Sequence, residues 1–458
     1  MPVHQEDVKS STMSGPRKLR FGAFEVDLQN QDLRKDGRQV KLERKPFQVM
    51  ELLLRVRGRF VTRAELTRTL WPNLHVNFER SLNTAVNSLR KALGDSPQNP
   101  SYIETKPGLG YRFIAPVEEV TSNSLVAANP SANENCAKAR YFLNKQTPAD
   151  LHKASAYLQA AIDEDSRCVR AYADLTETYC LFALMDMMTP AEAGARAKSM
   201  AASAVELDRN NAVARGALGR VKRFFDWDWA GAAEEFRAAI VLDGNCSGTH
   251  QAYGSFLCST GNTQSALLEL RCAQELDPAS PFINVEMAWV RYLARDFSGA
   301  DEQCWKVLIL EPTFAAAQHV LGLVHEQTGM YDEAVIEFQN ALASGDEQPA
   351  ILAALGHARA KAGKMGEAKE ALRGLERLSG KRYVSAYWHA VVCAGLGQKR
   401  AAIEWLEKAL EQRDVWMVWL GVDPRFDDLR SVPEFESVLQ QMGFDSARIA
   451  TGPDVSTT

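Results

Sequence analysis

The sequence predicts two dissimilar folds in one chain of 458 residues: a small α+β domain near the N-terminus, then an all-α solenoid. Three observations lead to this prediction. Residues 20–116 pass from short strand patterns to amphipathic helix patterns. Much of the remaining chain repeats itself every 34 residues. Charge divides at the same place: residues 17–116 hold 19 Lys and Arg against 10 Asp and Glu, whereas residues 117–458 hold 33 against 46.

The first domain opens with strand patterns. Residues 21–42 alternate apolar and polar positions and are interrupted at Asp36-Gly37, which predicts three or four short antiparallel strands. Pro46 suits the first turn of a helix, because a backbone N–H has no helical partner there. The buried face of this helix is expected to comprise Phe47, Met50, Leu53 and Leu54.

Two further helices follow. Thr62 and Glu65 have the spacing of a capping box and open a second helix, which ends at Trp71-Pro72. A third helix is predicted from about Phe78 to Leu93, with Gly94 as its left-handed stop.

The third helix has two chemically different faces. One face is an apolar stripe made of Leu82, Val86, Leu89 and Leu93. The other carries cations and short hydrogen-bonding side chains, the two kinds that a helix in a DNA major groove needs for phosphates and base edges. The candidate DNA-binding residues on this helix are Arg80, Asn83, Thr84, Asn87, Ser88, Arg90 and Lys91.

A tight hairpin with a basic tip follows this helix. Its strands are expected over residues 102–106 and 111–114, on either side of a Pro107-Gly108-Leu109-Gly110 turn. Lys106 and Arg112 stand at the turn, where they are placed to reach phosphates or a minor groove.

An ordered series of motifs in this domain resembles the winged helix-turn-helix effector domain of OmpR/PhoB-type bacterial regulators. The matching residues are Phe21-Gly22, Pro46-Phe47, Val61 to Leu66, Leu70-Trp71-Pro72, Leu89 to Gly94, Ile103-Glu104-Thr105 and Gly108 to Phe113. The resemblance implies that the second and third helices form the helix-turn-helix and that residues 72–77 form a loop able to contact RNA polymerase. It implies DNA contacts for Arg80, Thr84 and Ser88, a basic position at Arg90 and a wing arginine at Arg112. Asn87-Ser88 departs from the arginines common in that family, so base reading and phosphate contact both stay open for Asn87.

The rest of the chain carries a 34-residue period. Alanine stands at 232, 266, 300, 334, 368 and 402, and small residues at 254, 288, 322, 356 and 390. Small residues at these offsets let paired helices pack closely, and the period resembles the tetratricopeptide repeat. The resemblance implies a right-handed solenoid of about eight units, regular from residue 212.

The concave face of such a solenoid is the predicted partner-binding surface. Its candidate residues are Gln251, Trp289, Tyr292, His319, Glu326, His357 and Tyr387. They are of the kind that would hold a peptide or partner helix, and the alternative is that Trp289 and Tyr387 pack between repeats. The predicted segments are a disordered tail 1–19, the winged domain 20–116, a linker 117–135, the array 136–416, a terminal cap 417–446 and a disordered tail 447–458.

Catalytic and metal-binding signatures are missing from the sequence. It has no Walker A, GxSxG or HExxH motif, and its eight cysteines form no CxxC pair. We therefore expect no enzymatic activity, no cofactor and no metal. No run of 18 uncharged apolar residues and no secretory signal occur, from which we expect a cytoplasmic protein without a membrane partner.

The combined pattern resembles the HilA/CadC-type class of regulators, in a soluble form. It predicts a transcriptional regulator that binds double-stranded promoter DNA, as a homodimer if paired half-sites are used, with an array that binds an unknown protein or peptide or self-associates. The alternative is a non-enzymatic interaction scaffold whose winged helix no longer binds DNA specifically. The net charge of the first domain favours the regulator.

Overall fold

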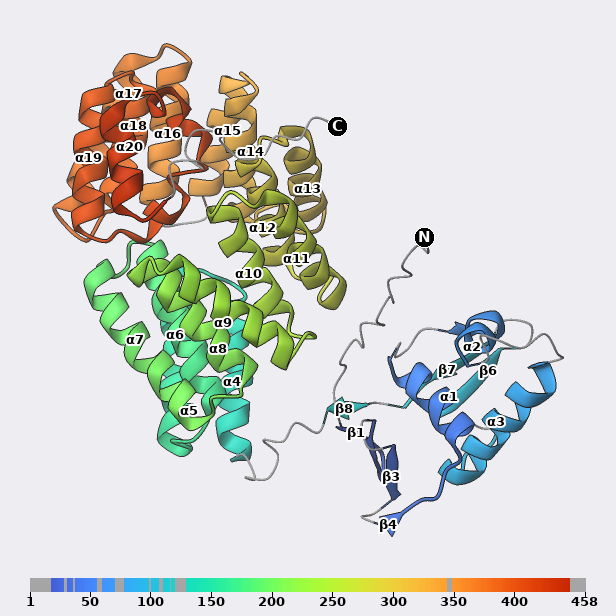
Figure 1. Ribbon diagram of the computed structural model, residues 1–458. Helices are drawn as coiled ribbons and strands as arrows, with labels where there is room; N and C mark the ends of the chain where they lie inside the picture. Colours follow the sequence, from blue (N-terminus) through green and yellow to red (C-terminus); the bar gives the residue numbers. More distant parts are fainter. Residues whose placement is uncertain are drawn as a thin grey trace, which may run out of the picture. The chain divides into compact units, whose positions relative to one another are not determined.

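The computed structural model describes residues 18–28, 31–35, 38–55, 60–70, 78–98, 100–106, 110–115, 117–119, 129–343 and 348–444. The chain forms two compact units, divided between Ala127 and Ala128. The first unit is α+β and the second is all-α, which confirms the predicted fold class. Figure 1 draws the first unit at the blue end of the colour scale and the second from green to red. Residues 1–17 and 447–458, predicted as tails, lie outside the described residues.

Two antiparallel sheets belong to the first unit. The first has the order β4-β3-β2-β1-β8 and the second β5-β7-β6. Three or four strands were expected near residues 21–42 and four are present, but β1 begins at Lys18, inside the range predicted as a tail. The bounds are β1 Lys18–Phe21, β2 Phe24–Asp27, β3 Asp32–Lys35, β4 Arg38–Gln39, β5 Val61–Thr62, β6 Ile103–Lys106, β7 Gly110–Phe113 and β8 Glu118–Glu119.

Three helices pack against these sheets: α1 (Arg44–Arg55), α2 (Arg63–Leu70) and α3 (Phe78–Leu93). The predicted capping box is confirmed, since the Glu65 N–H donates to Thr62 Oγ1 (3.2 Å) and the Thr62 N–H donates to Glu65 Oε2 (2.8 Å). Gly94 follows α3 with a φ of +67°, the left-handed stop expected there.

The second unit is built from eight consecutive helix pairs, which Figure 1 shows winding in sequence order. The first pair begins at Pro130, so residues 130–135 are helical although the sequence predicted a linker there. Asn129 explains the difference, because its side chain caps the helix by accepting from the Ser131 N–H (3.1 Å).

The first four pairs are α4 Pro130–Leu143 with α5 Pro148–Glu164, α6 Val169–Leu184 with α7 Pro190–Leu207, α8 Ala212–Val221 with α9 Trp229–Leu242, and α10 Ser247–Ser259 with α11 Thr263–Leu276. The others are α12 Pro281–Leu293 with α13 Phe297–Leu310, α14 Ala315–Gln327 with α15 Tyr331–Leu342, α16 Pro349–Lys361 with α17 Met365–Ser379, and α18 Ala386–Gly395 with α19 Lys399–Glu411.

Small residues hold the helices of each pair close together. The six alanines that recur every 34 residues from Ala232 to Ala402 are fully buried. At Gly322 a Cβ atom would lie 2.5 Å from the Phe338 ring, so only glycine fits beside that phenylalanine. The close packing expected from the repeat period is therefore present.

A C-terminal segment, residues 413–444, follows the last pair and lies along the first helices of several repeats. It contains η3 (Val415–Trp419), η4 (Pro424–Leu429) and α20 (Pro433–Gln441). Trp416 and Trp419 meet the Trp289 ring of α12 edge-on, at 6.4 and 6.2 Å between ring centroids. The predicted terminal cap thus covers much more than the last apolar face.

The turn between the two helices of a repeat has one position with positive φ. Gly261, Gly329, Gly363 and Gly397 share one position of the 34-residue period, and all have positive φ, a conformation that glycine adopts without strain. Arg295 occupies the same place with a φ of +61°. Its guanidinium donates to the Val422 carbonyl (2.5 Å) and to Asp427 (2.7 Å), so contacts with the C-terminal segment offset the backbone strain.

Asp186, in the turn between α6 and α7, joins the second repeat to the eighth. Its Oδ1 accepts from the Ser385 N–H (2.9 Å) and its Oδ2 from Trp388 Nε1 (2.8 Å). Trp416 Nε1 also donates to the Leu184 carbonyl (3.0 Å). Hydrogen bonds therefore join the second repeat of the array to the eighth repeat and to the C-terminal segment.

The stability of the array should depend on pH through Asp186. Burial, helped by nearby Asp414, raises the pKa of Asp186 to about 8. Its contribution is therefore complete below the unfolded pKa of about 4 and is lost as pH rises through about 8. Half-buried His319 and buried His389, whose pKa values fall to about 3 and 4, oppose this trend only at acid pH. Between pH 6.5 and 8.5 the Tm of the native chain should fall more steeply than that of Asp186→Asn; equal slopes would contradict the prediction.

Candidate nucleic-acid interface

Helix α3 presents the polar face that the sequence predicts. Leu82, Val86, Leu89 and Leu93 are buried in the core of the first unit. Asn83, Thr84, Asn87 and Lys91 are exposed and Ser88 is half-buried. The side chain of Arg80 and the whole of loop 72–77 lie outside the described residues. The exposed set combines a cation with amide and hydroxyl groups, which suits contacts with phosphates and base edges.

Asn83 is held in place by residues from two other elements. Its Oδ1 accepts from Arg63 of α2 (2.6 Å) and from the Tyr111 hydroxyl of β7 (3.0 Å). Arg63 also donates to the Tyr111 hydroxyl (2.9 Å) and lies over its ring. This triad fixes the angle between the exposed face of α3 and the hairpin.

Arg90 corrects the sequence prediction, because it is buried beneath the hairpin and does not lie on the exposed face. Its Nη2 atom donates to the Ile103 carbonyl and to Thr105 Oγ1, both at 2.7 Å. The neighbouring Asp95 carboxylate accepts from three backbone N–H groups, those of Ser101, Tyr102 and Ile103. Arg90 and Asp95 therefore fasten the end of α3 to β6, and Arg90 is not a DNA contact.

Arg90→Ala should therefore lower the stability of the first unit, by about 2–4 kcal/mol, because it leaves buried acceptors without a donor. The matched control is Lys91→Ala, one residue along the helix and exposed, which should change stability by less than about 0.5 kcal/mol. Hydrogen exchange of the α3 amides would measure both. Equal protection in the two variants would contradict a structural role for Arg90.

The hairpin carries the two other predicted cations. The Arg112 guanidinium pairs with Glu104 of the facing strand, its Nε lying 2.9 Å from the carboxylate, and it lies 4.5 Å from the centroid of the Phe60 ring. Lys106 is exposed, with its Nζ 5.8 Å from the same centroid. Residues 107–109 at the tip lie outside the described residues. Arg112 is half-buried, so a phosphate would compete with Glu104 for it.

Three residues at this site were missed from the sequence: Phe60, Arg63 and Tyr111. Arg63 and Tyr111 are 48 positions apart in the chain, so no local pattern links them. Arg63 does stand at the first position of a helix, where a cation opposes the helix dipole. This unfavourable position in the sequence could have indicated that the Arg63 side chain has a specific partner.

The predicted partner-binding face of the array is occupied by the chain itself. Tyr387 is fully buried and donates to Asp423 of the C-terminal segment (2.7 Å). His357 is also fully buried, with its Nδ1 2.7 Å from the Glu326 carboxylate. Tyr292 is buried, and Trp289 and Gln251 are half-buried. Burial lowers the pKa of His319, and the nearby Arg425 of the same segment lowers it further.

The prediction of an open partner-binding face is therefore wrong for buried Tyr292, Glu326, His357 and Tyr387 and for Trp289, whereas Gln251 stays a prediction. Its physical reason is that the Trp and Tyr side chains of the first helices pack against Trp416 and Trp419 and bond to Asp423. The alternative of internal packing holds for Trp289 and Tyr387.

Comparisons with known proteins identify both units. Residues 37–113 match the family model described as transcriptional regulatory protein, C terminal, and residues 384–414 match the tetratricopeptide repeat model. Both families are typically non-enzymatic. In the part of the chain that the structure describes, no helix is both long enough and apolar enough to cross a membrane.

The curated relatives extend beyond the matched region. The transcriptional regulatory protein KdpE of Mycobacterium tuberculosis (strain ATCC 25618 / H37Rv) is 36% identical over 97 residues, 21% of this chain and 43% of that protein. The transcriptional regulator HilA of Salmonella typhimurium is 26% identical over 155 residues, 34% of this chain and 28% of that protein. The chain thus spans less than half the length of these relatives. The crystal structure of the Klebsiella pneumoniae RstA DNA-binding domain with the RstA box is 28% identical, with a TM-score of 0.20, and covers 21% of this chain and 96% of that chain.

Proposed function

We propose that this chain, in which an OmpR/PhoB-type winged-helix domain precedes tetratricopeptide repeats, regulates transcription by binding promoter DNA. The observation that carries the proposal is the exposed polar face of α3, fixed beside the basic hairpin by Arg63, Asn83 and Tyr111. The excess of 19 Lys and Arg over 10 Asp and Glu in residues 17–116 supports it. The RstA neighbour, which was crystallised with its DNA box, points in the same direction.

The candidate residues divide into two groups by chemistry. Lys91, Lys106 and Arg112, with Arg80, supply phosphate contacts, whose strength falls as salt rises. Thr84, Asn87 and Ser88 supply base contacts, and Asn87 has the amide geometry that pairs with adenine. One small winged helix offers few base contacts, so we propose binding to paired half-sites by two copies. Loop 72–77 is the proposed contact with RNA polymerase.

Lys91→Ala is expected to weaken binding to all DNA sequences and to reduce the slope of log K against log salt by about one. Arg112→Ala should also weaken binding to all DNA sequences and reduce this slope by about one, because losing a phosphate contact means that fewer counterions are released on binding. Asn87→Ala should keep the slope and relax preference at one or two base pairs, by about 1–3 kcal/mol. Fluorescence anisotropy across a salt series measures all three. An unchanged slope in Lys91→Ala would remove α3 from the interface.

The experiment that tests the proposed function is selection of fragments from random DNA by the full-length protein. A regulator should enrich one motif, and Asn87→Ala should alter that motif. The rival interaction scaffold should enrich none and should show a flat salt titration. Arg400→Ala, a fully solvated substitution in the array, serves as the control for changes unrelated to DNA.

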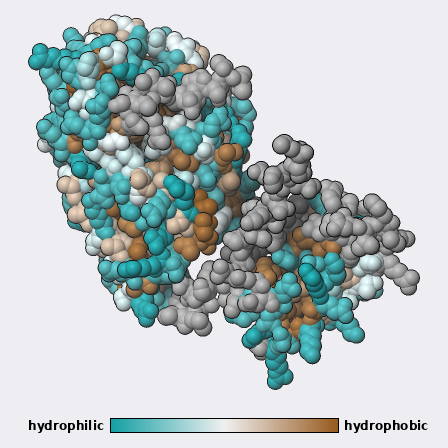
Figure 2. All heavy atoms as spheres, viewed as in Figure 1, coloured by the Kyte–Doolittle hydropathy of each residue, from teal (hydrophilic) through white to brown (hydrophobic). Residues whose placement is uncertain are grey.

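For the array, we propose that protein contacts use its outer edge, because its concave face is filled. Exposed leucines recur at the same place in three successive repeats: Leu242, Leu276 and Leu310 are 43%, 41% and 80% exposed. Ile309 (75%) and Trp305 (48%) enlarge this apolar ridge on α13. Figure 2 shows apolar side chains interrupting the mostly hydrophilic surface of the array. Sedimentation of Leu310→Glu against the native chain tests self-association there.

A further inference from the structure

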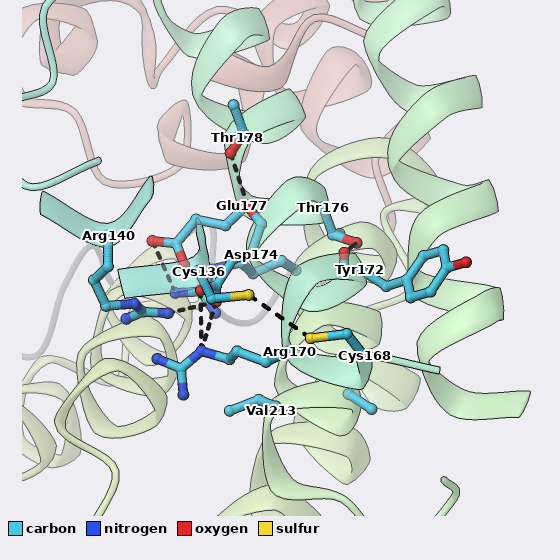
Figure 3. A network of polar contacts seen from close by, with 12 residues as sticks. Cys136, Arg140, Cys168, Arg170, Tyr172, Asp174, Thr176, Glu177, Thr178 and Val213 are labelled. Atoms are coloured by element: carbon cyan, nitrogen blue, oxygen red, sulfur yellow. Dashed lines mark hydrogen bonds and ion pairs between the residues drawn. The ribbon is translucent and has the colours of Figure 1, made fainter. Parts of the chain in front are cut away.

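Two thiols face each other at the start of the repeat array. Cys136 of α4 and Cys168, the residue that precedes α6, have sulfur atoms 3.7 Å apart (Figure 3). A disulfide bond requires about 2.05 Å, so the sulfurs are in contact but not bonded. Cys136 is 8% exposed and Cys168 is half-buried, so solvent reaches the pair from the Cys168 side.

A polar network holds the two helices in this arrangement. Asp174 of α6 accepts from Arg140 of α4 and from Arg170 of its own helix, whose Nε lies 3.0 Å from Oδ2. Only 4% of the Asp174 side chain is exposed. Arg140 lies one turn after Cys136, and Figure 3 shows this ion network next to the two sulfurs. The network bridges α4 and α6 beside the thiols, so their short separation is fixed by the surrounding structure.

The two sulfurs have different reactivity. The hydrogen bond shared with Cys136 lowers the pKa of Cys168 to about 6, against the effect of burial, and the backbone N–H of Ala171 lowers it further. The same pairing, together with burial, raises the pKa of Cys136. By contrast, burial raises the pKa of Cys180 to about 12. Cys168 is also the more exposed of the two sulfur-bearing residues, so it is the nucleophile of the pair and Cys136 the reserve thiol.

We propose that Cys136 and Cys168 form a peroxide-reactive dithiol site that closes to a disulfide and ties the first repeat to the second. The Cys168 thiolate attacks a peroxide oxygen, the O–O bond breaks, and the leaving oxygen takes a proton and departs as water or an alcohol. Cys168 is then a sulfenic acid. The Cys136 sulfur displaces its hydroxyl, the S–S bond forms, and water leaves with the Cys136 proton. With hydrogen peroxide, two thiols and one peroxide give one disulfide and two waters.

The test treats the full-length reduced protein with hydrogen peroxide, blocks remaining thiols with N-ethylmaleimide and maps peptides by mass spectrometry without reduction. The expected product is one cross-linked peptide pair joining residues 136 and 168, about 2 Da lighter than the two thiol peptides. Cys168 should react at least about tenfold faster than exposed Cys272, whose pKa is raised. If both thiols of the pair remain open to the maleimide while Cys272 is oxidised, the proposal is overturned.

Variants separate the roles of the two sulfurs. Cys136→Ser should let the sulfenic acid of Cys168 accumulate, to be trapped by dimedone. Cys168→Ser should leave Cys136 a thiol, and serine is a preferred residue at the start of a helix, so this variant should fold. Cys272→Ser is the matched control and should form the disulfide at the native rate. A dimedone adduct on Cys168 of the native chain, without the disulfide, would refute closure even if a variant failed to fold.

Discussion

Asp186→Ala is expected to lower the free energy of unfolding of the repeat array by about 2–5 kcal/mol, because it leaves two buried donors without an acceptor. These donors are the Ser385 N–H and Trp388 Nε1, about two hundred positions further along the chain. Asp186 is 1% exposed, so water does not replace the lost carboxyl oxygens. Denaturant unfolding followed by tryptophan fluorescence measures the change.

The control for this variant is Asp163→Ala. Asp163 is an exposed residue of α5 whose carboxylate accepts only from Gln159 among the bonds described (3.0 Å). Its loss should change stability by less than about 0.5 kcal/mol. If the two variants unfold at the same denaturant concentration, Asp186 does not join the ends of the array. Asp186→Asn, which keeps one acceptor oxygen, should fall between them.

Arg425→Ala should destabilise the array by about 3–5 kcal/mol, because it leaves the Asp423 carboxylate buried without its cation. Arg425 Nη2 lies 2.6 Å from Asp423 Oδ2, and both side chains are 1% exposed. Burial disfavours the Asp423 carboxylate, but Arg425 outweighs burial and holds the pKa of Asp423 below its usual value. Thermal unfolding of the array gives the size of the loss.

Two comparisons sharpen the Arg425 prediction. Arg400→Ala removes a 95% exposed guanidinium from a surface pair with Glu404 and should be almost neutral. The double variant Arg425→Ala/Asp423→Ala removes the stranded charge as well, so it should recover part of the stability lost in the single variant. A double variant that unfolds earlier than Arg425→Ala would show that the charge itself is not the cause.

The regular elements of the fold could be predicted because their signals are local. Helix α3 has the predicted bounds, Phe78–Leu93, since its apolar period and the Gly94 stop lie within one stretch of sequence. The alanines spaced 34 residues apart likewise predicted the helix pairs, because each repeat carries its own copy of the signal. The beginning of α4 was missed because Asn129 and Pro130 lie in a polar stretch without helical period.

The orientation of individual side chains was harder to predict, because distant residues decide it. In the sequence, Arg90 and Lys91 are both cations of the same helix. Arg90 is nevertheless buried, because it donates hydrogen bonds to Ile103 and Thr105 of the hairpin. The concave face of the array carries aromatic and polar groups suited to a peptide, and the peptide that fills it is residues 413–444. Nothing in the 34-residue period shows which segment covers that face.

The closure of the array through Asp186 has a consequence for the order in which the chain is made. During translation the second repeat leaves the ribosome about two hundred residues before Ser385 and Trp388, so its turn first exists without the donors that complete it. A chain cut before Ser385 would thus leave the Asp186 side chain without both donors. An open solenoid would lose only its last repeat, whereas here the second repeat gains these two bonds only after residue 388 has been made.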